Sequence, residues 1–125
     1  MNRFLLGLIA VTSLTVPAHA ESVYAVHPID GYKCMKLDLT EKQALDFSGA
    51  SLVWILTAPE THAPRGTWAA SVVLVRTPEH LVNGYLEVLQ ATGKPGWIEV
   101  DKVKPYDPNM RCVPSVMSNG RIGPG

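Results

Sequence analysis

Short apolar runs separated by turn-forming residues make up the middle of the chain. The runs cover residues 52–57, 68–76, 85–90 and 96–100 and are rich in Val, Ile, Leu, Trp and Tyr, the residue types that favour β-strands. Proline, glycine and Asn-Gly turns interrupt them at residues 58–60, 63–66, 77–78, 83–84 and 93–96. Four or five strands this short are stable in water only when they bury a common face, so the pattern predicts a small closed barrel or sandwich.

The first of these runs is apolar on both faces. Side chains alternate along a strand, so Val53, Ile55 and Thr57 share one face while Leu52, Trp54 and Leu56 share the other. A barrel interior accounts for one face only. The other face is either covered by the preceding segment, an interpretation favoured by the apolar Leu45 and Phe47 just upstream, or open to a partner as a binding surface.

The segments on either side of the runs carry weaker signals. Residues 21–50 combine turn signals with one short helix, expected at about residues 40–47, where Thr40 and Gln43 form a capping-box pattern and Gly49 provides a stop. Residues 107–125 are polar and loop-like, and we expect a mobile end there. The sequence thus divides into an N-terminal segment (21–50), a β-rich domain (51–106) and a tail (107–125).

The first twenty residues have the pattern of a signal peptide. Arg3 supplies a positive start, residues 4–16 are mostly apolar, and Ala18-His19-Ala20 has the small-x-small pattern of a cleavage site. We predict cleavage after Ala20 and a periplasmic or secreted protein. The apolar run is shorter than the roughly 20 residues that a membrane-spanning helix needs. No second run of that kind follows, so we expect no transmembrane segment in the mature chain.

The chain has two cysteines, Cys34 and Cys112. In an oxidising compartment the default is a disulfide between them. In the chain-entropy model, closing so long a loop stabilises the fold by about 4 to 5 kcal/mol. The competing interpretation is that Cys34 is a catalytic thiol, which would need a lowered pKa and a neighbouring histidine as base.

Charge and composition narrow the function. Eleven basic and eleven acidic side chains give a formal net charge of zero, so the basic footprint of a nucleic-acid-binding protein is missing. At 46% hydrophobic residues, with 10 glycines and 10 prolines in 125 residues, the chain is apolar enough for one small folded domain with many turns.

The sequence contains no G-x-S-x-G elbow, no H-E-x-x-H motif, no Gly-rich phosphate loop and no dinucleotide-binding fingerprint. The histidines of the mature chain, His27, His62 and His80, lie far apart in loops and lack metal-ligand spacing. Two acidic pairs, Glu99 with Asp101 and Glu60 with Glu79, are typical of a solvated sheet edge. We therefore expect no catalytic residue, no metal and no cofactor.

The middle segment resembles the bacterial SH3-like (SH3b) domain. The resemblance rests on the strand Leu52–Thr57 followed by Ala58-Pro59-Glu60, then Ala63-Pro64-Arg65-Gly66, Val72–Val75, Asn83-Gly84-Tyr85, and above all Gly96-Trp97-Ile98 after a Gly-Lys turn. It implies a mainly β fold, a small five-stranded SH3-like barrel over residues 51–106 preceded by the short helical segment and followed by a disulfide-tethered tail. It also implies a binding role without catalysis.

The candidate ligand-binding residues are aromatic side chains and one acid around the expected strands. They are Trp54, Glu60, Trp68, Tyr85 and Trp97. Aromatic side chains line the peptide grooves of SH3 domains, and SH3b domains of wall enzymes target peptidoglycan, so the expected ligand is a peptide, a peptidoglycan fragment or an envelope protein. Tyr85 and Trp97 are equally suited to a barrel core, whereas Trp68, at a loop exit, should be partly exposed. The alternative is a thiol-reactive protein or a structural subunit of an envelope complex.

Overall fold

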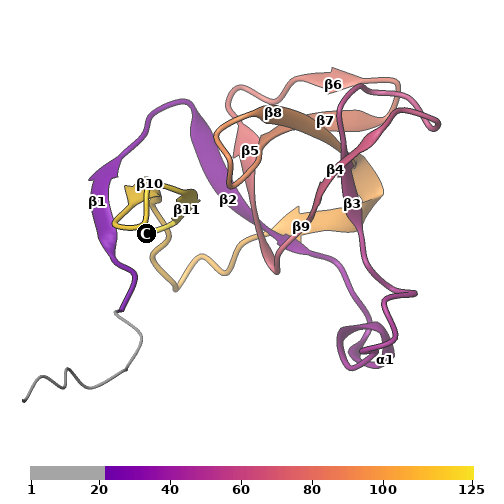
Figure 1. Cartoon of the computed structure of the whole chain (residues 1–125), viewed down its shortest axis with the longest axis horizontal. Helices are drawn as coiled ribbons and strands as arrows, with labels where there is room; N and C mark the ends of the chain where they lie inside the picture. Colours follow the sequence, from indigo (N-terminus) through magenta and orange to yellow (C-terminus); the bar gives the residue numbers. More distant parts are fainter. Residues whose placement is uncertain (1–21) are drawn as a thin grey trace, which may run out of the picture.

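A computed structural model describes residues 22–125 and shows a mainly β protein with two antiparallel sheets (Figure 1). The signal peptide expected at residues 1–20 lies outside the described residues. Among the residues that the structure does describe, no helix is long and apolar enough to cross a membrane.

The larger sheet curls around a common interior (Figure 1). Its strands follow the order β4 (Arg65–Trp68), β3 (Trp54–Leu56), β8 (Pro95–Glu99), β7 (Tyr85–Leu89), β5 (Val72–Arg76), β2 (Tyr32–Leu37) and β9 (Val103–Pro105). A further short strand, β6 (Leu81–Val82), pairs with β7, and the 3₁₀ turn η1 (Val100–Lys102) links β8 to β9. The path of paired strands is open, because β4 and β9 each have one strand neighbour.

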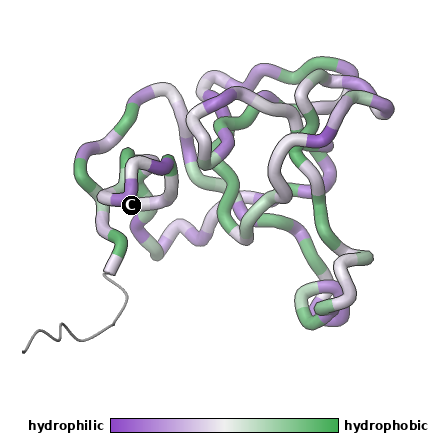
Figure 2. Tube along the Cα trace, in the orientation of Figure 1, coloured by the Kyte–Doolittle hydropathy of each residue, from purple (hydrophilic) through white to green (hydrophobic). Residues whose placement is uncertain are grey.

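The core fills the concave side of this sheet. Along each central strand the apolar side chains alternate, and the inward set is buried. It comprises Leu37, Ile55, Ala69, Val73, Val75, Leu86, Val88, Ile98 and Val103. Figure 2 shows hydrophobic stretches on the strands around this interior, and a further one at the loop that carries α1 (Glu41–Ala44). Of the two apolar faces of the first run, the one that carries Val53 and Ile55 is therefore the face that packs in the core.

The second sheet joins segments from the two ends of the described chain. It consists of β1 (Ala25–Pro28), β10 (Pro114–Met117) and β11 (Ile122–Pro124) in the order β1-β10-β11. The expectation of a loop-like, mobile tail at residues 107–125 is wrong for this part, because β10 and β11 form a hairpin whose open side pairs with β1. These strands are stabilised by hydrogen bonds between segments far apart in sequence, which the local sequence pattern does not indicate.

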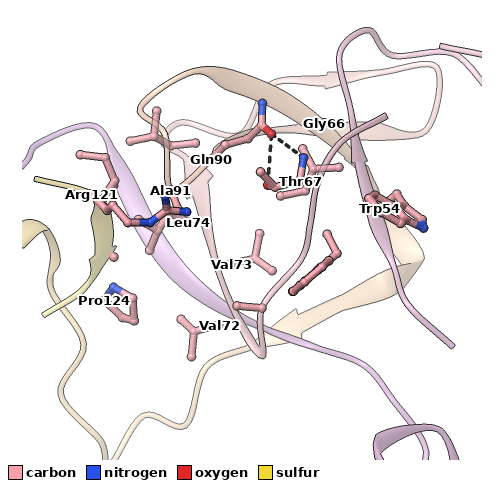
Figure 3. A pocket seen from close by; sticks show the side chains of 16 residues that line it. Trp54, Gly66, Thr67, Val72, Val73, Leu74, Gln90, Ala91, Arg121 and Pro124 are labelled. Atoms are coloured by element: carbon pink, nitrogen blue, oxygen red, sulfur yellow. Dashed lines mark hydrogen bonds between the residues drawn. The ribbon is translucent and has the colours of Figure 1, made fainter. Parts of the chain in front are cut away.

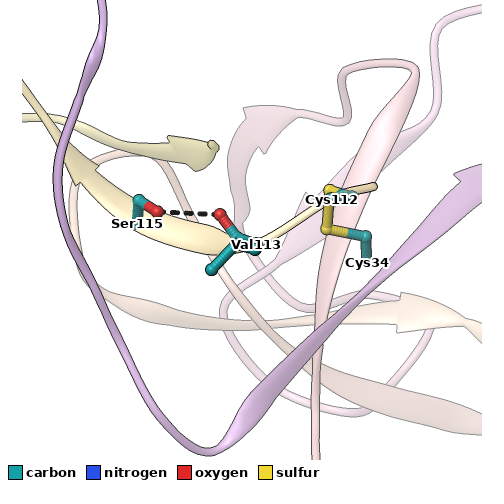
Figure 4. The surroundings of a disulfide bond; sticks show 4 residues. All are labelled: Cys34, Cys112, Val113 and Ser115. Carbon is teal, nitrogen blue, oxygen red and sulfur yellow. Dashed lines mark hydrogen bonds between the residues drawn. A yellow bond between two sulfur atoms is a disulfide. The ribbon is translucent and has the colours of Figure 1, made fainter. Parts of the chain in front are cut away.

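The predicted disulfide is confirmed. Cys34 lies on β2 and Cys112 lies just before β10, with Cα atoms 6.2 Å apart and 78 positions between them in sequence (Figure 4). Beside it, the buried Ser115 hydroxyl donates to the carbonyl of Val113 at 2.8 Å. The bond thus fastens the second sheet to β2, the strand next to the edge strand β9 of the first sheet.

Several local predictions need correction. The helix is confirmed with its capping box, in which Thr40 Oγ1 accepts from the Gln43 amide and Gln43 Oε1 accepts from the Thr40 amide, but it ends at Ala44 instead of residue 47. The residues 21–50 also contain β1 and β2, which were not expected. The run 68–76 is two strands, because the chain turns a corner at residues 69–71 and carries β4 to one edge of the sheet and β5 to its middle.

The expected cover over the first run is also wrong. Phe47 is 92% exposed and Leu45 is 63% exposed, so neither packs on the outer face of β3. The short helix projects from the body of the molecule (Figure 1). The outer face of β3, which carries Trp54 and Leu56, instead remains partly open.

Candidate binding cleft

An open cleft lies between the larger sheet and β11. It has a volume of about 490 Å³ and is largely apolar. Figure 3 shows Arg121 and Pro124 on one side and Trp54 on the other, with Val72, Val73 and Leu74 of β5 between them. The remaining lining residues are Ile55, Gly66, Thr67, Trp68, Ala70, Leu89, Gln90, Ala91, Ile122 and Gly123. Size and apolar lining match those of small-molecule and peptide sites.

Two tryptophans form one wall of the cleft. Trp54 and Trp68 are cross-strand partners in the β3–β4 pair, and their rings meet edge to face at 6.4 Å and 77°. The Arg65 guanidinium lies 4.8 Å from the centre of the Trp54 ring, a cation–π contact that holds this ring in place. Trp68 is 59% exposed, in agreement with its expected position at a loop exit. Trp68 therefore presents aromatic surface to solvent.

A buried glutamine fixes the strand that carries Trp68. The Gln90 side chain is 5% exposed, and its Oε1 accepts from both the backbone amide (2.9 Å) and the hydroxyl (3.1 Å) of Thr67. Its Nε2 donates to the Pro95 carbonyl at 3.1 Å. A Cβ added at Gly66 would collide with the Gln90 amide, and one at Gly96 would collide with Ile55. Glycine at both positions makes room for this bridge between β4 and the β7–β8 hairpin.

Arg121 lies on the opposite wall. The tight β10–β11 turn places it, since Gly120 has a φ of +82° and the Arg121 carbonyl accepts from the Met117 amide at 2.8 Å. The next residue, Ile122, donates its amide to the Ala91 carbonyl at 2.9 Å and so ties β11 to the β7–β8 turn. Arg121 is the one charged residue among those that line the cleft within residues 22–125.

A second, more polar hollow of about 470 Å³ lies on the other side of Trp54. Its walls include the outer face of β3, the Arg65 side chain and Tyr85, together with Glu99 and Asp101 near η1. Trp54 therefore separates two hollows of different character. Only the first combines apolar walls with a single charge.

The structure brings some of the predicted site residues together and separates others. Trp54 and Trp68 meet in the cleft. Tyr85 is buried and lines the neighbouring polar hollow. Glu60 lies in the exposed turn after β3 and lines neither hollow, and Trp97 lies on the outer face of β8 with its ring 5.3 Å from that of His80.

Sequence reasoning missed the rest of the cleft. Gln90 and Arg121 were not singled out, and neither were the β11 residues Ile122 and Pro124. The available signals were indirect. Gln90 is a polar residue directly after a strand with a glycine downstream, and Arg121 follows an Asn-Gly pair. Both patterns are common on protein surfaces. Only the pairing of distant strands shows that these two residues line a cleft.

A charged cluster surrounds Glu87 on the outer face of β7. Its Oε1 lies 2.8 Å from both Arg76 Nη1 and His80 Nδ1. The hydrogen bond with His80 lowers the pKa of Glu87 below its ordinary value, against a partial burial that raises it, and the bond and charge of Arg76 lower it further. A carboxylate already engaged by two partners favours a structural role for this cluster.

The lowered pKa of Glu87 predicts acid sensitivity. Because this pKa is lower in the folded than in the unfolded chain, the ionised carboxylate contributes stability above about pH 4.3, and the contribution is lost as pH falls through the folded-state pKa. Thermal unfolding should show a Tm difference between wild type and Glu87→Gln that is largest near about pH 6 and shrinks toward about pH 2.5. Glu99→Gln is the control, since Glu99 is exposed and enters none of the ion pairs of the described residues. A Tm difference for Glu87→Gln that stayed constant with pH would contradict this role.

The described residues contain neither a cluster of metal ligands nor a free cysteine. Among residues 22–125 no three His, Cys, Asp or Glu side chains gather in a way that could hold a metal ion. Cys34 and Cys112 are bonded to each other and the sequence has no third cysteine. The expected alternative of a catalytic Cys34 thiol therefore has no free sulfhydryl in this structure.

Comparisons of the chain with protein-family models, with curated proteins and with solved structures find no significant match. The site must therefore be interpreted from its own geometry.

Proposed function

We propose that this protein is an exported, non-catalytic binding module with an SH3-like barrel, which holds an extended peptide in the cleft between β4 and β11. Peptidoglycan stem or cross-bridge peptides and segments of envelope proteins are the two sources of such a peptide. The observation that carries the proposal is the Trp54–Trp68 pair, which lines one side of an open cleft with an apolar floor. Rigid aromatic walls of this kind bind extended chains in SH3 grooves.

The strand plan supports the barrel. The curled, antiparallel sheet places Gly96-Trp97 at the start of a late strand, and a 3₁₀ turn follows before the last strand of that sheet. The Gly96-Trp97 element agrees with the SH3b resemblance, whereas the sheet also includes β2 from outside residues 51–106 and its strand path is open. The Gln90 side chain bonds β4 to the end of β7, a strand with which β4 has no backbone pairing.

The disulfide supports export. A bond between residues on two sheets persists in an oxidising compartment such as the periplasm or the extracellular space. It agrees with the cleavable leader that the sequence predicts at residues 1–20.

Retention on the natural ligand should depend on Trp68. We expect the purified, oxidised protein to bind insoluble peptidoglycan or one protein of a detergent extract of the source envelope, with Trp68→Ala weakening retention about tenfold or more. The reason is that exposed tryptophans at the centre of a site commonly contribute more than about 2 kcal/mol to binding. Sedimentation of sacculi and elution from immobilised protein measure the two arms.

Phe47→Ala is the matched control, since it also removes an exposed aromatic ring but lies outside the cleft. It should bind as the wild type does. Failure to bind in both arms contradicts the proposed function, and retention that Trp68→Ala leaves intact places the ligand elsewhere.

A further inference from the structure

Arg121 gives the cleft a charge that an apolar peptide segment alone does not use. It is the one charged lining residue of the described cleft, and it faces the floor across from the tryptophan wall. Figure 3 shows its side chain directed from the β11 side toward Leu74 and Ala91. A cation in this position is available to a bound ligand.

Within residues 22–125, no carboxylate forms an ion pair with the Arg121 guanidinium. By contrast, Lys33, Arg76 and Lys104 each pair with an acid. The backbone on both sides of Arg121 is nevertheless fixed, by the Met117 and Ala91 hydrogen bonds. The backbone position of Arg121 is thus defined, while its charge has no ion-pair partner among the described residues.

We propose that the cleft selects peptides that carry a carboxylate, which forms a paired hydrogen bond with Arg121 while apolar side chains of the peptide contact the tryptophan wall and the β5 floor. This inference rests on the proposed function. Arg presents a planar fork of donors that matches the two oxygens of a carboxylate. One carboxylate also balances the single positive charge of the cleft, whereas a phosphate group would bring close to two negative charges.

The carboxylate has two sources in a peptide, its C-terminus and an acidic side chain. Both offer the same two oxygens to Arg121. A peptide bound by its free C-terminus ends at Arg121, whereas a peptide bound by an internal glutamate continues past it, and the experiment separates the two.

Three peptide pools test the inference. Each contains acetylated tetrapeptides of Ala, Val, Leu and Phe, prepared as free C-terminal acids, as neutral C-terminal amides, or as amides with one position replaced by glutamate. The oxidised protein is immobilised, and the retained fraction of each pool is measured. We expect at least one acidic pool to be retained about tenfold or more over the neutral pool, since hydrogen bonds to charged groups are the stronger ones.

The preference should disappear with the charge of Arg121. In Arg121→Gln the ratio of acidic to neutral retention should fall to about one, and in the wild type it should fall as salt screens this solvent-facing charge. Arg111→Gln is the matched control, because Arg111 is exposed and lines neither hollow. It should keep the wild-type ratio.

The outcomes separate this inference from the proposed function. Preferred retention of the pool with free C-terminal acids identifies the peptide C-terminus as the source of the carboxylate. Preferred retention of the glutamate pool identifies an acidic side chain as the source. Equal retention of all three pools overturns carboxylate selection and leaves a peptide-binding cleft. A preference that survives in Arg121→Gln overturns the role of Arg121. No retention of any pool overturns carboxylate selection, and the sacculus and envelope arms then decide the proposed function.

Discussion

Replacing Cys34 and Cys112 together by serine is expected to lower the free energy of unfolding by about 4.5 kcal/mol. The bond closes a loop of 78 positions, and its removal returns that loop-closure entropy to the unfolded chain. A domain of this size has a net stability of about 5 to 15 kcal/mol, so the loss is a large part of the total. Urea unfolding of the oxidised wild type and the double variant measures it.

The loss should begin in the second sheet. The bond lies between β2 and the start of β10, so without it β10 and β11 are held by β1 and by the Ile122–Ala91 hydrogen bond. In the double variant, we expect the Ile122 amide to exchange its proton faster than the amides of β7 do. Reductant should reproduce the effect in the wild type and change nothing in the double variant. A change below about 1 kcal/mol would contradict the entropic account.

Gln90→Leu should cost about 2 to 4 kcal/mol. Leucine fills most of the same volume but leaves the Thr67 amide and the Pro95 carbonyl without their partner at a buried site, and an unsatisfied buried group costs about 1 to 3 kcal/mol. The variant should also weaken peptide binding, because β4 and Trp68 lose the bridge that positions them. Denaturant unfolding and the retention assay measure the two effects.

Thr92→Val is the control for Gln90. Thr92 lies exposed in the same turn, and its hydroxyl accepts one long bond of 3.4 Å from the Lys94 amide. Its replacement should change stability by no more than about 0.5 kcal/mol. Equal effects of the two substitutions would show that Gln90 acts as a surface residue.

Local signals predicted the parts of the fold that are decided locally. The Thr40–Gln43 capping box does begin a helix, and Asn83-Gly84 does form the β6–β7 turn with φ angles of +52° and +82°. The pairing of Cys34 with Cys112 could be predicted because the chain has two cysteines and the predicted signal peptide indicates an oxidising compartment. In each case the residues that determine the structure lie close together or have no competitor.

Elements stabilised by distant partners could not be predicted in this way. β2 carries lysines at Lys33 and Lys36, so only Met35 and Leu37 show an inward apolar pattern, too short to indicate a strand. It forms because β5 and β9 pair with its two edges. The hairpin of β10 and β11 is likewise completed by β1.

The same distinction applies to the cleft. Aromatic residue type was enough to single out Trp54 and Trp68, since few other roles suit a tryptophan next to a loop. Gln90 and Arg121 have ordinary residue types, and their importance comes from strands far away in sequence. For the same reason, the sequence prediction places Trp97 and Glu60 in one site with Trp54 and Trp68, although the fold separates them.

The register of the second sheet also sets a timetable for assembly. His27 pairs with Val116. In a chain that emerges N-terminus first, β1 therefore cannot pair with β10 until nearly all the residues between them have emerged. Such distant pairings form slowly compared with local hairpins such as β7–β8. Arg121 and Pro124 arrive later still. The wall opposite Trp54 and Trp68 is therefore the last part of the cleft to form.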